Sequence, residues 1–282
     1  MRPARRDFKG GAFRALLLFS LVVGLVTLAT LLVDVVGKGW GYLDWTLFSA
    51  PPSIDPAIAG ARPAILATIY LGFLLLLFTV PIGVGTAIYL EEYADRNRWY
   101  NRLLELNIQN LAGVPSIVYG ILGLAFLVRG IGLGRVLLAG ALILTLLVLP
   151  TVIIAAREAI RAVPDSIRQG GYALGATQWQ VTSRQVLPAA LPGIATGSIL
   201  ALSRGIGETA PLIMIGAVTY IAFDPTLFGA FTALPIQIYQ WVRLPQEEFR
   251  LLAAAAIIVL LGILLSLNAV AIWLRNRYQR RW

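Results

Sequence analysis

The stretch VLLAGALILTLLVLPTVIIAA runs from Val136 to Ala156 without a charged residue, between Arg135 and Arg157. A helix needs about 20 apolar residues to cross about 30 Å of hydrocarbon, and this stretch is long enough. The whole chain has the same character, because 58% of its residues are hydrophobic, only 13% are charged and its mean hydropathy is +0.79. These values indicate a membrane protein with several spans.

Five further runs are comparably long and apolar. We therefore predict an all-α membrane protein, a single transmembrane domain over residues 1–282 with six transmembrane helices. No small-residue cleavage site follows the first run, which favours a retained helix over a removed signal peptide. The predicted spans are 15–33, 64–90, 107–128, 136–156, 190–214 and 251–274.

The basic residues indicate how the chain is oriented. The formal net charge is +9, from 23 Lys and Arg against 14 Asp and Glu. With a cytoplasmic N-terminus, 16 of the 23 basic residues fall in inner segments and 6 in outer segments, the asymmetry that sets orientation during insertion. We predict that both termini are cytoplasmic, and nucleic acid is not needed to explain the positive charge.

Several kinds of chemistry lack the residues they need. Cys and His are absent, so thiolates, disulfides, imidazole ligands and a histidine base are excluded. Only Glu208 lies well inside an apolar stretch, so a pair of carboxylates at membrane depth lacks its second member. The two lysines, Lys9 and Lys38, do not close a Gly-Lys-Ser/Thr phosphate loop. We expect no catalytic residue, no metal and no cofactor, and ATP hydrolysis only on another chain.

The stretch SRGIGETAPL, residues 203–212, places two charges inside the fifth span. Arg204 and Glu208 are four residues apart, so they share a helix face and can pair with each other or with a partner. A guanidinium in a watery cavity can bind an oxyanion such as phosphate with two hydrogen bonds. The alternative is a buried ion pair that only holds helices or subunits together.

The residues around this pair favour an irregular backbone. Gly205 and Gly207 weaken the helix, and Pro211 has no N–H to donate to the Gly207 carbonyl. GIGETA also fits the dinucleotide pattern G-x-G-x-x-A, but it follows a long apolar helix where that site requires a strand.

A polar segment follows the fourth span. Pro164 and Asp165 are typical of a first helical turn, and residues 165–183 predict a cytoplasmic helix that lies along the membrane. Arg157 lies at the inner mouth of the fourth span, where it can form a surface salt bridge with Glu158 or Asp165.

Three blocks resemble one family. NLAGVPSIVYGILGL (110–124), RAVPDSIRQGGYALGATQWQVTSRQVLPAALPGIATG (161–197) and RGIGETAPL (204–212) are similar to the PstA-type inner-membrane permeases of bacterial phosphate ABC importers. The resemblance extends from about the second span to the sixth. GETAPL is more similar to PstA than to its partner permease, PstC.

The polar segment resembles the coupling loop of such permeases, Glu-Ala-Ala, three residues, Gly, nine residues and Ile-x-Leu-Pro. Four positions depart from this pattern, because glutamine stands for Glu and Ile and glycines stand for both alanines. The resemblance assigns coupling to the ATPase to Gln169, Gly170, Gly171, Gly175, Leu187 and Pro188, with Gln185 at the isoleucine position.

The resemblance implies a type I ABC importer permease in the bacterial inner membrane. It implies a heterodimer with a PstC-like permease, two copies of an ATP-binding subunit and an extracytoplasmic phosphate-binding protein. Arg204 would line the path of phosphate, with Glu208 orienting it. Arg157 is the second candidate for this pathway, and the surface salt bridge is its alternative role.

Three different functions remain open. The substrate could be another oxyanion, such as sulfate, molybdate or phosphonate, since arginine geometry does not separate these anions. The chain could also be an intramembrane enzyme, or a secondary carrier driven by an ion gradient.

Overall fold

The structure is a computed structural model that describes residues 8–95, 97–217 and 220–278. Some of the basic residues that we count as cytoplasmic, at 1–7, 96 and 279–282, lie outside the described residues. Within the described ranges every regular element is a helix. The α-helices are α1 (Phe8–Gly39), α2 (Trp45–Ser49), α3 (Arg62–Ile88), α4 (Trp99–Ala112), α5 (Ser116–Gly123), α6 (Leu137–Arg161), α7 (Asp165–Ala173), α8 (Gln178–Val181), α9 (Leu187–Gly207), α10 (Ala210–Met214), α11 (Leu234–Arg243) and α12 (Glu247–Tyr278).

Short helical turns of other kinds adjoin these helices. One is a 3-10 turn, η1 (Trp40–Tyr42). The others are π-helical turns, η2 (Tyr89–Tyr93), η3 (Leu124–Gly130) and η4 (Thr182–Val186).

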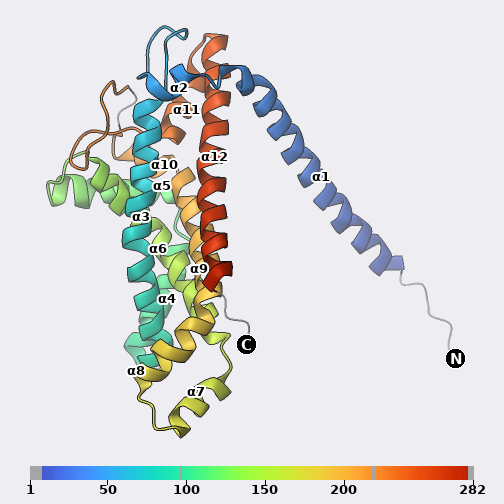
Figure 1. Ribbon diagram of the computed structural model, residues 1–282, viewed down its shortest axis with the longest axis vertical. Helices are drawn as coiled ribbons and strands as arrows, with labels where there is room; N and C mark the ends of the chain where they lie inside the picture. The colour runs from blue at the N-terminus through green and yellow to red at the C-terminus, as the bar shows by residue number, and fades with distance from the viewer. Residues whose placement is uncertain (1–7, 96, 218–219, 279–282) are drawn as a thin grey trace.

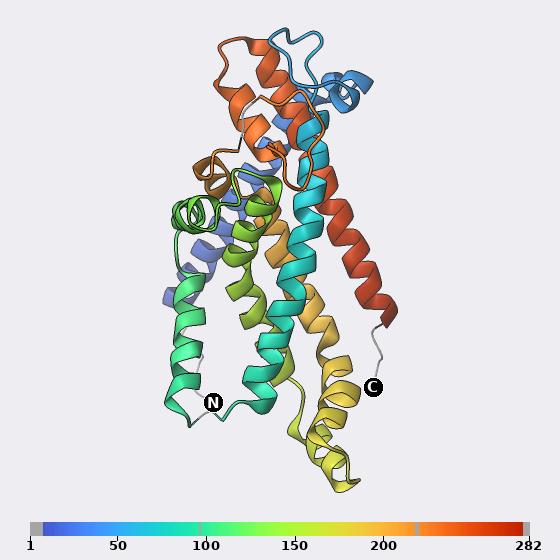
Figure 2. The ribbon, with the colours of Figure 1, turned by 90° about the vertical axis from the view of Figure 1, so that its left-hand side faces the viewer.

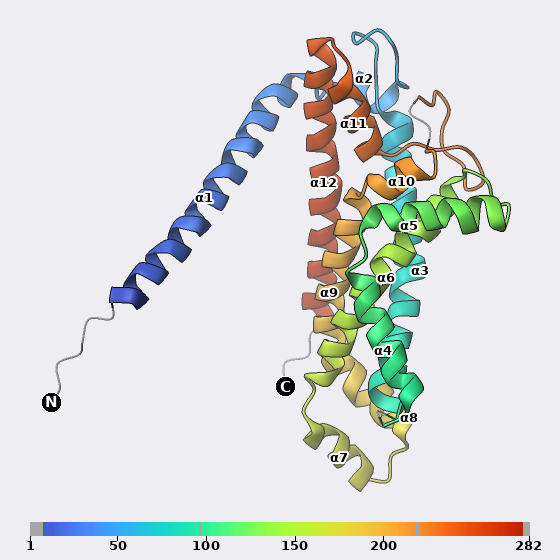
Figure 3. The same ribbon diagram turned by 180° about the vertical axis from the view of Figure 1, so that it is seen from behind.

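Four long helices, α3, α6, α9 and α12, form an elongated bundle (Figure 1). The short helices α7 and α8 lie at one end of the bundle, and α2 and α11 lie at the other. Seen from behind, α5 runs across the bundle instead of along it (Figure 3). Among the described residues, five helices are long and apolar enough to cross a membrane, or six if the bent pair that contains α4 and α5 is one span.

The centre of the bundle is α6, which packs against α3 on one side and α9 on the other. Ile143 and Leu144 in α6 are fully buried, as is Leu75 in α3. Lipid chains are as apolar as these side chains, so close van der Waals packing rather than exclusion of water must hold the helices together.

Small residues provide that close packing. A Cβ on Gly83 of α3 would lie 2.7 Å from Cγ1 of Val152 in α6. On α9, a Cβ on Gly197 would lie 2.4 Å from Cβ of Ala155. Both values are far below van der Waals contact, so these glycines allow the backbones to approach as they do at helix contacts in membranes.

Helix α1 departs from the rest of the fold. It leans away from the bundle in Figure 1 and passes behind the bundle in the view of Figure 2, and its side chains from 13 to 34 are exposed. Its C-terminal end packs against α12, where a Cβ on Gly39 would lie 2.6 Å from the backbone of Ala254.

The third predicted span, 107–128, is not one straight helix. It belongs to two helical segments, Trp99–Ala112 and Ser116–Gly130, that meet at 105°. Pro115 explains the break, because proline has no N–H for a helical bond and forces the preceding residue out of the helical conformation.

The fifth predicted span and the segment 165–183 are interrupted as well. Within 190–214, α9 ends at Gly207 and α10 begins at Ala210, with Pro211 in its first turn. Within 165–183, the expected single helix is divided into α7, α8 and part of the π-helical turn.

Candidate functional site

Arg204 lies in the last turn of α9, and 71% of its side chain is exposed in the isolated chain. Its Nε lies 3.6 Å from Oε1 of Glu208, whose side chain is 20% exposed. This separation is longer than a hydrogen bond, so the two residues form a loose ion pair. The guanidinium donors therefore remain accessible to a ligand or to a partner chain.

Three segments meet around Arg204. It borders a cavity of about 20 Å³, which holds roughly one water molecule. The other lining residues come from the α4–α5 break, from α6 and from α9, and they are Leu111, Ala112, Val114, Leu147, Val148, Thr151 and Ala201. The α4–α5 break thus borders the same cavity as Arg204, and the α9–α10 break follows Arg204 directly along the chain.

Gly205 and Gly207, the two glycines predicted to weaken the helix, lie beside Arg204, but their surroundings differ. Glu208 has an extended backbone, and its N–H donates to the Gly205 carbonyl at 3.2 Å. A Cβ on Gly205 would lie 2.6 Å from Cγ2 of Val148, so this glycine is a packing position. A Cβ on Gly207 would meet nothing within 4 Å, so Gly207 is not required for packing within the chain.

Arg157 is buried, with 8% of its side chain exposed, and its partners differ from those predicted. Its Nε donates to Oε1 of Glu91 at 2.9 Å, and Nη2 donates to Oε1 of Glu105 at 2.8 Å. Neither expected partner, Glu158 or Asp165, pairs with it among the ion pairs of the described chain. The prediction of a surface salt bridge is therefore wrong, because α6 turns Arg157 inward to carboxylates of two other helical segments.

A second arginine, Arg168 of α7, connects the polar segment to η2, the turn that follows α3. Its Nη2 lies 2.8 Å from Oε1 of Glu92, and its guanidinium also donates to the carbonyls of Ile160 and Val163. Gln178 at the start of α8 donates to the Glu92 carbonyl. The polar segment is therefore fastened to η2 and to the end of α6 by polar contacts, of which those of Arg168 are partly buried.

The carboxylates Glu91 and Glu92 connect these arginines. They are adjacent in η2, with 2% and 4% of their side chains exposed. Glu91 also accepts from Arg161 of α6 at 2.7 Å. One charged cluster, which comprises these three arginines with Glu91, Glu92 and Glu105, thus joins η2, α4, α6 and α7.

The sequence analysis did not single out Arg168, Glu91 or Glu92. Two adjacent glutamates at the end of an apolar span were a usable signal, since charges there need partners when the helix ends are buried. The identity of those partners depends on helices that are 52 to 76 residues apart along the chain, which spacing alone does not reveal.

Gly175 ends α7 with a left-handed backbone, φ +77°. The N–H of Ala176 donates to the Gly171 carbonyl at 3.2 Å, and that of Gly175 donates to the Tyr172 carbonyl at 2.9 Å. This is the Schellman arrangement, in which glycine is favoured because a side chain is strained at positive φ. Gly175 therefore has a local structural reason to be glycine.

The two glycines that replace alanine in the coupling pattern have different surroundings. Gly170 is exposed, and a Cβ there would meet nothing within 4 Å. Gly171 is buried, and a Cβ would lie 2.8 Å from both Oε1 of Gln185 and Cγ2 of Val181. The glutamine that replaces isoleucine thus occupies space beside the glycine that replaces alanine.

The remaining residues of the coupling pattern are spread around this segment. Gln169 lies in the exposed part of α7, next to Gly170. Leu187 and Pro188 begin α9, where proline is acceptable because first-turn N–H groups have no helical partner.

The family of the chain follows from comparison with known proteins. Residues 79–282 match the family described as the binding-protein-dependent transport system inner membrane component. The chain therefore belongs to this family of membrane permeases.

Relatives within the family share nearly the full length of the chain. Phosphate transport system permease protein PstA 1 of Mycobacterium tuberculosis (strain CDC 1551 / Oshkosh) is 32% identical, over 98% of this chain and 92% of the relative. PstA of Yersinia pestis is also 32% identical, over 96% and 91%. The chain is a PstA-type permease.

Solved structures show the same fold. A chain of a bacterial alginate ABC transporter, in complex with an alginate pentasaccharide-bound periplasmic protein, has a TM-score of 0.65 at 20% identity, covering 97% of this chain and 99% of that one. A chain of the MetNI methionine ABC transporter, in an inward-facing conformation, has a TM-score of 0.61 at 20% identity, covering 78% and 95%. The fold is that of type I ABC importer permeases.

Proposed function

We propose that this PstA-type permease forms half of the membrane pathway of an ATP-driven importer of inorganic phosphate, and that Arg204 lines the pathway. The names of its relatives support phosphate as the substrate. The observation that carries the role of Arg204 is its accessible guanidinium, which is only loosely paired beside two helix breaks.

The contrast with the other arginines supports this assignment. Arg157 and Arg168 each make charge-assisted hydrogen bonds shorter than 3 Å and are mostly buried, so their donors already have partners. Arg204 has most of its side chain exposed. An arriving oxyanion can therefore take two of its donors without first breaking a strong ion pair.

Glu208 has a supporting part in this proposal. Its carboxylate would repel an anion, and its side chain is far less exposed than that of Arg204. In this proposal Glu208 either orients the Arg204 side chain or contacts an arginine of the partner permease.

The proposed assembly contains four kinds of partner. A PstC-like permease supplies the other half of the pathway, and two copies of an ATP-binding subunit contact the polar segment. An extracytoplasmic binding protein delivers phosphate, as the family description and the complex of the alginate transporter support. The lipid bilayer surrounds the permease pair.

The proposed topology has six spans in the bacterial inner membrane, with the bent pair of α4 and α5 as the third. Both termini are cytoplasmic, and so is the end that carries α7 and α8. The excess of Lys and Arg in the segments at this end supports that orientation.

The charged cluster supplies a route by which ATP binding could act on the pathway. A push on α7 would act on Glu92 through Arg168, and through the adjacent Glu91 on Arg157 and Glu105. Glu105 lies in α4, whose last residues border the cavity of Arg204. We propose that displacement of α7 thereby moves α4 relative to α9.

The test is ATP-driven phosphate uptake into proteoliposomes by the complete importer. Arg204→Ala is expected to lower uptake by about 10-fold to 100-fold, because a hydrogen bond to a charged group is worth roughly 1.5–3 kcal/mol. Arg204→Lys should recover part of the loss, since lysine keeps the charge but not the planar fork.

Arg98→Ala is the matched control. Arg98 is an exposed arginine whose contact with Asp95 is 3.7 Å long, and its removal should leave uptake unchanged. Normal uptake by an equally assembled Arg204→Ala importer would contradict the pathway role. Competition by sulfate, molybdate and phosphonate in the same assay tests phosphate as the substrate.

A further inference from the structure

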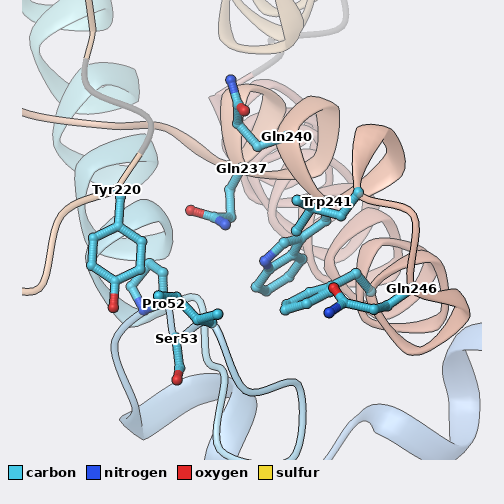
Figure 4. A pocket seen from close by; sticks show the side chains of 10 residues that line it. Pro52, Ser53, Tyr220, Gln237, Gln240, Trp241 and Gln246 are labelled. Carbon is cyan, nitrogen blue, oxygen red and sulfur yellow. The ribbon is translucent and has the colours of Figure 1, made fainter.

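A pocket of about 230 Å³ (Figure 4) lies at the end of the molecule that carries α2 and α11, opposite α7 (Figure 1). One wall is the loop 52–54 between α2 and α3, and another is α11 with the start of α12. Tyr220, from the segment between α10 and α11, lies across from these helices. The topology proposed above places this pocket on the outer face.

The pocket contains a buried acceptor that the described chain does not satisfy. Gln237 is 2% exposed, and its Oε1 is buried without a hydrogen-bond partner in the described residues. Its amide points into the space between Tyr220 and Trp241 (Figure 4). Buried amide oxygens are normally hydrogen-bonded because an unmet acceptor is costly, so this oxygen favours an occupant that carries a donor.

The lining also indicates which occupant is suitable. No residue that lines the pocket is charged, and amides and hydroxyls alternate with the apolar surfaces of Ile54, Leu244 and Phe249. Phosphate is therefore a poor occupant. A neutral group with an apolar side chain and an N–H donor matches both parts of the lining.

The size of the pocket favours one part of a larger molecule. Sites for free small molecules usually measure about 300–1,000 Å³, and this pocket is smaller. Ile54 is 84% exposed and Tyr220 is 53% exposed at its border, so apolar surface extends beyond the pocket. Such surface is typical of a place where a protein docks.

We propose that this pocket receives an uncharged segment of the extracytoplasmic binding protein, inserting an apolar side chain and donating a peptide N–H to Oε1 of Gln237. The proposal rests on the proposed function, which supplies the binding protein and the outward orientation. The pocket is then the docking site of the binding protein, separate from the anion path at Arg204.

The natural absence of cysteine makes a direct test possible. Gln240→Cys at the pocket and Ile58→Cys on the same outer loops are each introduced into the complete importer, in a nanodisc. The rate of labelling of this chain by a charged maleimide is measured with and without saturating phosphate-loaded binding protein. We expect at least a fivefold slower rate at position 240 and a smaller effect at the exposed control position 58.

A filling variant gives an independent readout. Gln240→Trp should raise the binding-protein concentration for half-maximal ATPase stimulation at least tenfold. Ile58→Trp should leave that concentration unchanged.

Each other outcome is decisive. Unchanged labelling at position 240 in an importer that the binding protein stimulates would overturn this inference and leave the proposed function intact. Equal protection at both positions, or full protection by the partner permease alone, would overturn the pocket as the docking site. Failure of the binding protein to stimulate the wild-type importer would overturn the proposed function together with this occupant.

Discussion

The two adjacent glycines of α7 provide a sharp test of how the polar segment is packed. Gly170→Ala adds a methyl group where nothing lies within 4 Å, whereas Gly171→Ala adds one 2.8 Å from Cγ2 of Val181. Ordinary contact needs at least 3.4 Å, so Val181 must move by about 0.6 Å. Because Val181 is fully buried and β-branched, it has little freedom to do so.

The magnitude follows from two opposing terms. Alanine is better than glycine in a helix by about 1 kcal/mol, and both variants gain this amount. Overpacking costs about 1–3 kcal/mol, and only Gly171→Ala bears it. We therefore expect Gly170→Ala to be more stable than Gly171→Ala by about 1–3 kcal/mol, which corresponds to a factor of roughly 5 to 150 in a local opening equilibrium.

The assay is hydrogen exchange of the α7 amides in the complete importer, followed by mass spectrometry. The α7 amides should exchange more slowly in Gly170→Ala than in the wild type. They should exchange distinctly faster in Gly171→Ala than in Gly170→Ala. Adding Val181→Ala to Gly171→Ala should recover part of the loss, because the two side chains are in contact. Equal protection of α7 by the two alanine substitutions would refute the packing argument.

Substitutions at the other charged and glycine positions give three more predictions. Arg157→Ala should lower the stability of the complex by about 3–5 kcal/mol, because it removes one partner of a buried ion pair; an unchanged Tm of the purified complex would contradict this. Glu208→Gln should leave Tm unchanged and alter the KM for phosphate uptake by no more than about fivefold, since the pair is 3.6 Å long with a mostly exposed arginine and such pairs are worth about 0–1 kcal/mol; a loss as large as that of Arg204→Ala would give Glu208 a direct role. Gly205→Ala should lower Tm, because overpacking reduces the free energy of unfolding by about 1–3 kcal/mol, while Gly207→Ala should not. Equal effects of the two substitutions on Tm would exclude the packing difference between them.

Local patterns predicted the helices and where they weaken. Long apolar runs must be helical in a bilayer because every backbone group needs an internal partner. Pro211 and its neighbouring glycines correctly marked the interruption of the fifth span. Pro115 was present as an equally clear signal in the third span, yet apolar length alone suggested one continuous helix there.

Side-chain partners were much less predictable. Arg157 was assigned to Glu158 or Asp165 because they are close in sequence, whereas its partners come from η2 and α4. Likewise, the departures at Gly171 and Gln185 were visible as two separate changes. Only the folded segment shows that they share one space.

The separation of α1 from the bundle has a consequence for how the protein experiences its membrane. The apolar run 15–33 is about 28 Å long at 1.5 Å per residue, close to the thickness of an average bilayer. Because α1 and α12 point in different directions (Figure 1), they cannot both stand along the membrane normal. A thicker or thinner membrane will therefore mismatch the two helices by different amounts. With its close approach to α12 at Gly39, α1 can change its tilt to absorb that mismatch while the helices around Arg204 keep theirs.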